Sequence, residues 1–185
     1  MAKIKTLYVY LLCFFVCSST FSQNDLGQPA TQSKRFCLKQ IYDSQLGVRE
    51  QGGANQGKQV EQYLASVGFG PGFPWCAAFV SWCYQQANVE APKSAWVPSY
   101  AQKQRIIYKR GRFIKELPQP GDVFLIWYQR LNRPAHIGFV DEWKQDWVIT
   151  VEGNTNDNGS REGDGVYRKK RLKRQVWAVV DFIGE

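Results

Sequence analysis

The sequence predicts a single α+β domain, with helices in the first half of the chain packed on an antiparallel β-sheet formed by the second half. Between residues 34 and 87 apolar side chains recur at helical spacing, whereas from Gly121 onward short runs rich in β-branched and aromatic residues alternate with turn residues. Helices first and strands afterwards are typical of an α+β domain. The chain has 185 residues and is 44% hydrophobic, which suits one domain with a sizeable core and excludes wholesale disorder.

The first 22 residues have the composition of a secretory signal peptide. Two lysines precede an apolar run over residues 7–16, and small polar residues follow as far as Ser22. The apolar run is short for a membrane span, which needs ~20 residues. We therefore expect cleavage after Ser22 and an exported protein that is periplasmic or extracellular. An uncleaved anchor, or a lipid anchor at Cys17, is the alternative.

Polar residues 23–33, with a glycine and a proline, are expected to form a linker, so that residues 34–185 make up the domain. A glycine-rich loop at residues 50–57 separates the first two predicted helices. The third helix is apolar on nearly every side, which indicates a buried central helix. Residues 88–121 are mixed, with a possible short helix at residues 99–106. The three helices are predicted over Lys34–Leu46, Lys58–Val67 and Trp75–Ala87.

Five runs of strand length follow, separated by turn residues. The short gaps between them favour antiparallel pairing. The runs cover residues 123–128, 135–143, 147–154, 165–172 and 176–183.

Cys76 is the first candidate for chemistry. It lies in the opening turn of the predicted buried helix, where unsatisfied N–H groups and the helix dipole favour an anion, and therefore a thiolate nucleophile. A small buried core residue is the alternative. Cys83 lies seven residues later, about 10 Å along the helix, which is too far for a disulfide to Cys76. A Cys37–Cys83 pair would leave Cys76 as the unpaired thiol, because cleavage of the signal peptide leaves an odd number of cysteines.

His136 is the only histidine in the sequence, so a zinc site built from several histidines is excluded. It lies in a predicted strand, where alternation places it on one face with Gly138. In the next strand Glu152 and Asn154 share a face at the strand's end. Either could accept a hydrogen bond from the imidazole and fix its tautomer, so that the other ring nitrogen faces a thiol. Taken one at a time, a structural histidine and an ordinary turn are the alternatives.

A nucleophile at a helix start, a base on a strand and an orienting group on the neighbouring strand match the logic of cysteine acyl-transfer enzymes. The segments PWCAAFVSWC (74–83), PGD (120–122), AHIGFV (135–140) and VEGN (151–154) together resemble the CHAP family of cysteine- and histidine-dependent amidohydrolases and peptidases. The resemblance extends from about residue 48 to near the C-terminus.

This resemblance implies a papain-like fold and cleavage of amide bonds in bacterial peptidoglycan. It further implies Cys76 as nucleophile, His136 as general base and acid, and Glu152 with Asn154 as orienting residues. The related NlpC/P60 group fits less well, because its third residue is often a second histidine. Some CHAP enzymes bind calcium through an Asp-rich loop; the stretch at residues 50–58 has one acid, so we expect no metal and no cofactor.

Four further features bear on substrate and partners. Asn55, Trp75 and Trp96 are candidates for substrate binding, with a capping role for Asn55 and a core position for the aromatic rings as alternatives. Residues 168–174 carry six Lys or Arg side chains, and the formal net charge is +8. In an exported protein this run favours association with an anionic cell envelope over nucleic acid, although a merely solvated face is an equal alternative.

The sequence thus predicts a secreted cysteine amidase or endopeptidase that acts on peptidoglycan. The alternatives are an inactive wall-binding module and a thiol hydrolase for an amide outside peptidoglycan. The bond cleaved and the oligomeric state are left open.

Overall fold

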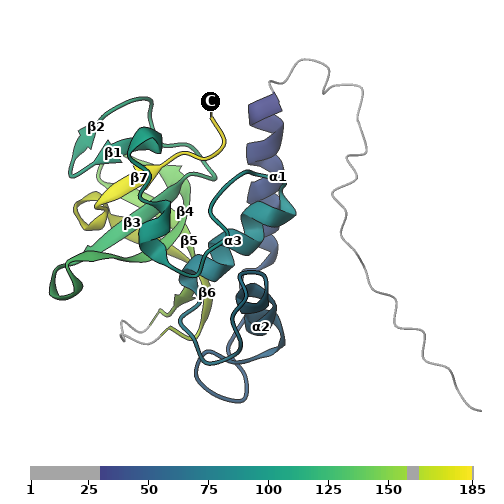
Figure 1. Cartoon of the computed structure of the whole chain (residues 1–185). Helices are drawn as coiled ribbons and strands as arrows, with labels where there is room; N and C mark the ends of the chain where they lie inside the picture. The colour runs from purple at the N-terminus through teal and green to yellow at the C-terminus, as the bar shows by residue number, and fades with distance from the viewer. Residues whose placement is uncertain (1–29, 158–162, 185) are drawn as a thin grey trace, which may run out of the picture.

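The computed structural model describes residues 30–157 and 163–184. It shows three helices on one side of a seven-stranded antiparallel sheet, which confirms the predicted α+β architecture (Figure 1). None of the helices within these residues is long and apolar enough to cross a membrane. The helices are α1 (Ala30–Ser44), α2 (Lys58–Ala65) and α3 (Cys76–Gln86).

The sheet has the strand order β2-β1-β7-β3-β4-β5-β6, so the last strand of the chain lies in its interior. The four strands from β3 to β6 follow one another along both the chain and the sheet, as expected from their short connections. The strands are β1 (Ile106–Lys109), β2 (Arg112–Phe113), β3 (Val123–Tyr128), β4 (Arg133–Trp143), β5 (Trp147–Thr155), β6 (Gly165–Leu172) and β7 (Ala178–Val180).

Helix α3 is the centre of the main core, because nearly all of its side chains are apolar and buried. Its aromatic ring Phe79 packs on Phe139 of β4, with ring centroids 6.0 Å apart. The opposite face of the sheet holds a smaller cluster around Phe124 and Val140. The strands alternate between these two clusters, as the period of two predicts.

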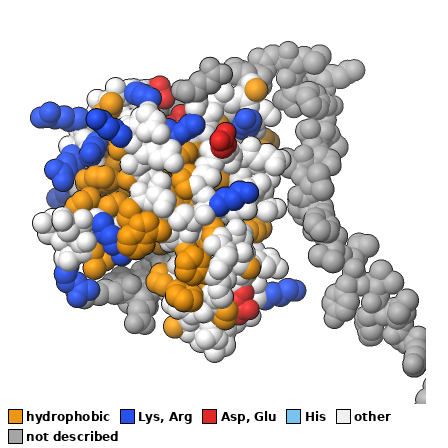
Figure 2. Space-filling model, viewed as in Figure 1, with side chains coloured by type: hydrophobic (Ala, Val, Ile, Leu, Met, Phe, Trp, Pro, Cys, Tyr) orange, Lys and Arg blue, Asp and Glu red, His pale blue; other side chains and the backbone are white. Residues whose placement is uncertain are grey.

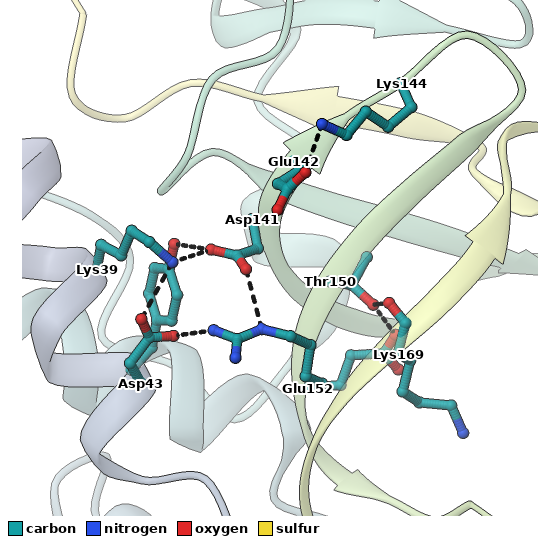
Figure 3. A network of polar contacts seen from close by, with 10 residues as sticks. Lys39, Asp43, Asp141, Glu142, Lys144, Thr150, Glu152 and Lys169 are labelled. Carbon is teal, nitrogen blue, oxygen red and sulfur yellow. Dashed lines mark hydrogen bonds and ion pairs between the residues drawn. The ribbon is translucent and has the colours of Figure 1, made fainter.

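Charged side chains tie α1 to the sheet. The buried carboxylate of Asp141 on β4 accepts hydrogen bonds from Lys39, from the Tyr42 hydroxyl at 2.9 Å and from Arg168 Nε at 3.0 Å. Asp43 completes the network with Lys39 and Arg168, and Figure 3 shows Lys39, Asp43 and Asp141 turned toward one another. Burial raises the pKa of Asp141, but its cationic partners outweigh this and lower it below its ordinary value. The α1–sheet contact therefore depends on charge as well as on apolar packing.

Several sequence-based boundaries differ from the structure by a few residues. Residues 30–33, expected in the linker, form the first turn of α1, because the glycine and proline of that stretch lie upstream of them; the rest of the linker and the signal peptide fall outside the described residues. Residues 99–106 form 3-10 turns and the start of β1 instead of a helix. Strand β7 ends at Val180, because the Asp181 carboxylate accepts the N–H groups of Ile183 and Gly184 and turns the chain.

Candidate active site

Cys76 is the first residue of α3, and only 6% of its surface is exposed. The side chain of the N-cap residue, Trp75, makes no hydrogen bond to the first helical turn, so it does not occupy the N–H groups there. Strand β5 approaches this turn closely at Gly153. A Cβ at Gly153 would lie 2.7 Å from the Trp75 ring and 2.8 Å from Phe79, so only glycine fits. The helix start is thereby held against the end of β5.

His136 on β4 lies between Cys76 and Glu152. Its Nε2 is 2.8 Å from Oε2 of Glu152. Cys76 lies close enough to the imidazole to raise its pKa. Since Nε2 is engaged by Glu152, Nδ1 is the nitrogen left for the thiol. Gly138, two residues along β4, makes room for this contact, because a Cβ there would lie 2.9 Å from Cγ of Glu152.

The Glu152 carboxylate is completely buried and is held from two further sides. The Thr150 hydroxyl donates to Oε1 at 2.5 Å, and Figure 3 shows the two side chains together on β5. Arg171 of β6 donates from Nε to Oε1 and from Nη2 to Oε2, both at 2.5 Å. Such a two-pronged pair is strong and fixes the plane of the carboxylate. Arg171 therefore compensates a charge that burial would otherwise penalise.

These contacts shift the pKa values of the pair in opposite directions. Burial lowers the pKa of His136, but hydrogen bonds with Cys76 and Glu152 outweigh it and raise the pKa from 6.5 to about 9. Burial raises the pKa of Glu152, but hydrogen bonds from Arg171 and His136 lower it from 4.5 to about 2. Near neutral pH the site therefore holds an imidazolium beside a carboxylate.

The shifts predict how pH affects stability. The raised pKa of His136 contributes stability that is complete below pH 6.5 and is lost as pH rises through about 9. The lowered pKa of Glu152 contributes stability above pH 4.5 that is lost as pH falls through about 2. Thermal unfolding from pH 5 to 10 should show a loss of stability between pH 6.5 and 9 that is smaller in His136→Asn. Equal losses in both proteins would contradict the raised pKa of His136.

Asn154, predicted as the other possible partner of the imidazole, lies elsewhere. Its amide nitrogen donates to Asn55 Oδ1 at 2.9 Å and to Glu50 Oε1 at 3.3 Å. Glu50 Oε1 also accepts the Trp75 indole N–H at 2.8 Å, and Oε2 accepts the backbone N–H of Asn55. Glu50 thus connects the loop before α2, the end of β5 and the residue that precedes Cys76. Glu152, and not Asn154, contacts His136.

The three predicted substrate-binding residues differ in exposure. Trp75 is completely buried and stacks on Tyr63, with ring centroids 5.6 Å apart, so it is a core residue and cannot contact a substrate. Asn55 lies in the Glu50 network and does not cap α2, whose N-cap is Gly57. Trp96 is 53% exposed, with the Arg133 guanidinium 4.1 Å from its ring centroid.

Trp96 and Tyr128 are two exposed aromatic side chains with links to the elements of this site. The segment that follows Trp96 is tied to α3 by the Tyr100 hydroxyl, which donates to the carbonyl of Ala77 at 3.2 Å. Burial raises the pKa of Tyr128; Cys76 and Glu152 add to the shift and Arg171 opposes it, so its hydroxyl senses all three groups. Arg133 pairs with Tyr128 across β3 and β4.

Cys83 belongs to the core and is not one of the groups that contact His136 or Glu152 among the described residues. Cys83 is a fully buried free thiol, and burial raises its pKa. The Cys37–Cys83 disulfide considered from the sequence is therefore not formed.

Sequence reasoning missed Arg171 and Glu50. Arg171 was one of six charges in a run assigned to envelope contact or to solvent. The signal was present, since alternation along β6 places Arg171 on one face with Lys169, and Arg168 on the other. Glu50 lies in the predicted glycine-rich loop, and nothing in the sequence links it to Trp75.

A thiol at the start of a buried helix, with a histidine and a carboxylate on adjacent strands of an antiparallel sheet, defines the class of papain-like cysteine hydrolases. Comparison with family models narrows the class: residues 68–154 match the CHAP domain, and the chain carries a CHAP domain over that range. The match includes Cys76, His136 and Glu152, whereas Arg171 lies beyond it. CHAP domains are typically cysteine hydrolases and generally act on cell-wall peptidoglycan. No curated protein and no solved structure gives a significant match.

Proposed function

We propose that this protein is a cysteine amidohydrolase or endopeptidase that cleaves an amide bond in bacterial peptidoglycan. The observation that carries the proposal is the continuous line of contacts from Cys76 through His136 to Glu152. A wall-binding module would have no need of a thiol paired with an imidazole. The CHAP domain supports peptidoglycan as the substrate.

The proposed reaction is acyl transfer. The Cys76 thiolate attacks the scissile carbonyl carbon, and the carbonyl oxygen becomes an oxyanion. An N–H group at the start of α3, that of Cys76 itself, donates to this oxyanion. Collapse of the intermediate breaks the C–N bond, and the leaving amine takes its proton from the His136 imidazolium.

A water molecule then releases the acyl group. His136, now neutral, takes a proton from this water while the oxygen attacks the thioester carbonyl carbon. The C–S bond breaks, giving a carboxylic acid product and restoring the thiolate–imidazolium pair. Glu152 keeps its charge throughout and holds Nε2, so that Nδ1 serves both proton transfers.

Export fits this activity, because peptidoglycan lies outside the cytoplasmic membrane. We therefore propose that residues 1–22 act as a cleaved signal peptide. N-terminal sequencing of the protein recovered from the cell envelope would test this proposal, with Gln23 as the expected first residue.

The decisive test of the activity is peptidoglycan digestion by residues 23–185 and by the same chain with Cys76→Ala. Cys76 is small and nearly buried, so alanine should leave the fold intact while removing the nucleophile. We expect new muropeptides with free amine ends, detected by mass spectrometry, from the wild type and at least a thousandfold less from the variant.

The products would also identify the bond. A free amine on the stem peptide together with a lactyl carboxylate on the sugar would show an amidase, and a new amine within the stem or cross-bridge would show an endopeptidase. Equal digestion by Cys76→Ala would contradict the cysteine mechanism. Sedimentation with peptidoglycan, without cleavage by either protein, would favour a binding module.

A further inference from the structure

A concave site is lined by residues other than the proposed catalytic ones. It is a cavity of about 430 Å³ where the β1–β2 turn, the end of β3 and the segment between β6 and β7 meet. This volume lies within the range of small-molecule sites, roughly 300–1,000 Å³. Cys76, His136 and Glu152 are not among its lining residues.

Aromatic rings form part of the wall of this cavity. Trp127 and Trp177 lie against each other, with ring centroids 5.0 Å apart and their planes inclined by 37°. Tyr108 also lines the cavity. A backbone hydrogen bond holds the β1–β2 turn beside Trp177, because the N–H of Arg110 donates to the carbonyl of Trp177 at 2.9 Å. Half-buried indole rings of this kind offer an apolar surface to the C–H face of a sugar ring.

The rest of the lining is cationic. Arg110, Lys173 and Arg174 line the cavity, and none of the described residues that line it is Asp or Glu. Arg110 and Arg174 are exposed and form no ion pair with a described residue. Figure 2 shows Lys and Arg side chains gathered around hydrophobic ones on the side of the molecule where Figure 1 places β1, β2 and β7. The cavity therefore combines unpaired positive charge with aromatic surface.

Arg110 occupies an unfavourable backbone position. Lys109 pairs with Arg112, so Arg110 and Gly111 form a two-residue hairpin turn, with φ angles of 48° and 83°. Such a turn favours Asn, Asp or Gly at its first position, and another residue there costs about 1 kcal/mol. The Arg110 side chain thus lines the cavity in a backbone conformation that lowers local stability, and such strain is common at binding sites.

We propose that this cavity binds an anionic saccharide, with a sugar ring on the Trp127–Trp177 wall and its acidic groups on Arg110 and Arg174. Single-stranded nucleic acid fits less well, because it requires successive open aromatic platforms along a groove. Here the Trp127 and Trp177 rings pack against each other and line a single cavity. The site is independent of the Cys76 reaction proposed above, so either proposal can fail alone.

Binding would be measured by isothermal titration calorimetry, with trigalacturonic acid as the probe and neutral maltotriose as its uncharged counterpart. Arg110→Asn is the informative variant, since it removes the charge and relieves the turn. Its thermal midpoint should equal or exceed that of the wild type, while its Kd for trigalacturonic acid should rise at least tenfold. Arg174→Gln, at an exposed position, should also weaken binding, about fivefold.

Lys93→Gln/Lys103→Gln is the matched control, because both lysines are exposed and lie outside the cavity. It should leave the Kd unchanged within twofold. Absence of trigalacturonic acid binding at millimolar concentration, or equal weakening by the control, would overturn the proposal. So would equally tight binding of inorganic phosphate, which would mean a simple anion site. Tighter binding of a thymidine oligonucleotide of the same charge would assign the cavity to nucleic acid instead.

Discussion

Replacing His136 by asparagine is expected to lower the rate of amide hydrolysis by three to four orders of magnitude. Asparagine places an amide near the position of Nδ1 and leaves the Nε2 position toward Glu152 empty. It can neither accept the thiol proton nor protonate the leaving amine. The loss should be in kcat, because His136 acts on the reacting groups and is almost fully buried. The measurement is the release of free amine ends from purified peptidoglycan over time.

A second readout separates catalysis from folding. Iodoacetamide should alkylate Cys76 near pH 7 in the wild type, and the rate should fall at least tenfold in His136→Asn. Cys83 is the internal control within the same molecule, because burial raises its pKa and excludes the reagent. Equal alkylation rates of Cys76 in the two proteins, with native circular dichroism spectra, would mean that His136 does not activate the thiol.

Replacing Arg171 by methionine should cost about 3–5 kcal/mol of stability, the usual penalty for leaving one member of a buried ion pair without its partner. The side chain of Arg171 is 16% exposed and that of Glu152 is fully buried, so little water can replace the lost guanidinium beside the carboxylate, which keeps only His136 and Thr150 as partners. Glu152 should then bind a proton more readily. Activity should fall as a result, because the neutral carboxyl group holds the His136 imidazolium less well. Urea unfolding, followed by tryptophan fluorescence, measures the first effect.

Lys170→Met is the matched control. Lys170 is the next residue on β6, is exposed, and lies over the Trp147 ring at 4.2 Å. The Lys170→Met substitution should lower the free energy of unfolding by less than about 1 kcal/mol. The double variant Glu152→Gln/Arg171→Met should regain part of the lost stability, because the buried carboxylate is then removed together with its guanidinium partner, but it should stay impaired in hydrolysis. A loss in Arg171→Met no larger than in Lys170→Met would contradict the role given to Arg171.

The elements with a strong period were predictable from sequence. Strands β3 and β6 have the expected bounds, and α3 begins one residue after its expected start. Their side chains alternate or cluster in a way that only one secondary structure can bury. The short strands β1 and β2 were not predicted, because they are held by pairing with each other and with β7 near the C-terminus.

The residues of the site also divide into those that the local sequence pattern predicts and those that depend on contacts between distant segments. Cys76, His136 and Glu152 could be chosen because each lies at a diagnostic place on a helix or a strand. Whether Glu152 or Asn154 meets the imidazole depends on Gly138 and on the turn of the chain at Asn154, where φ is 52°. The compensating charge of Arg171 depends on the β5–β6 register, in which Arg171 faces Val148. Such registers are three-dimensional facts that a single sequence does not specify.

The site draws on four elements spread along the chain: α3, β4, β5 and finally β6. A ribosome that has synthesised the chain through Glu152 has already produced the nucleophile, the base and the orienting carboxylate, but not the guanidinium that makes burial of that carboxylate tolerable. The carboxylate and the imidazole therefore cannot settle into their buried positions until the last strands are made. The hydrolytic activity proposed for this chain would therefore be acquired only after β6 is made, and a truncated product that ends before Arg171 should be inert even though it contains Cys76, His136 and Glu152.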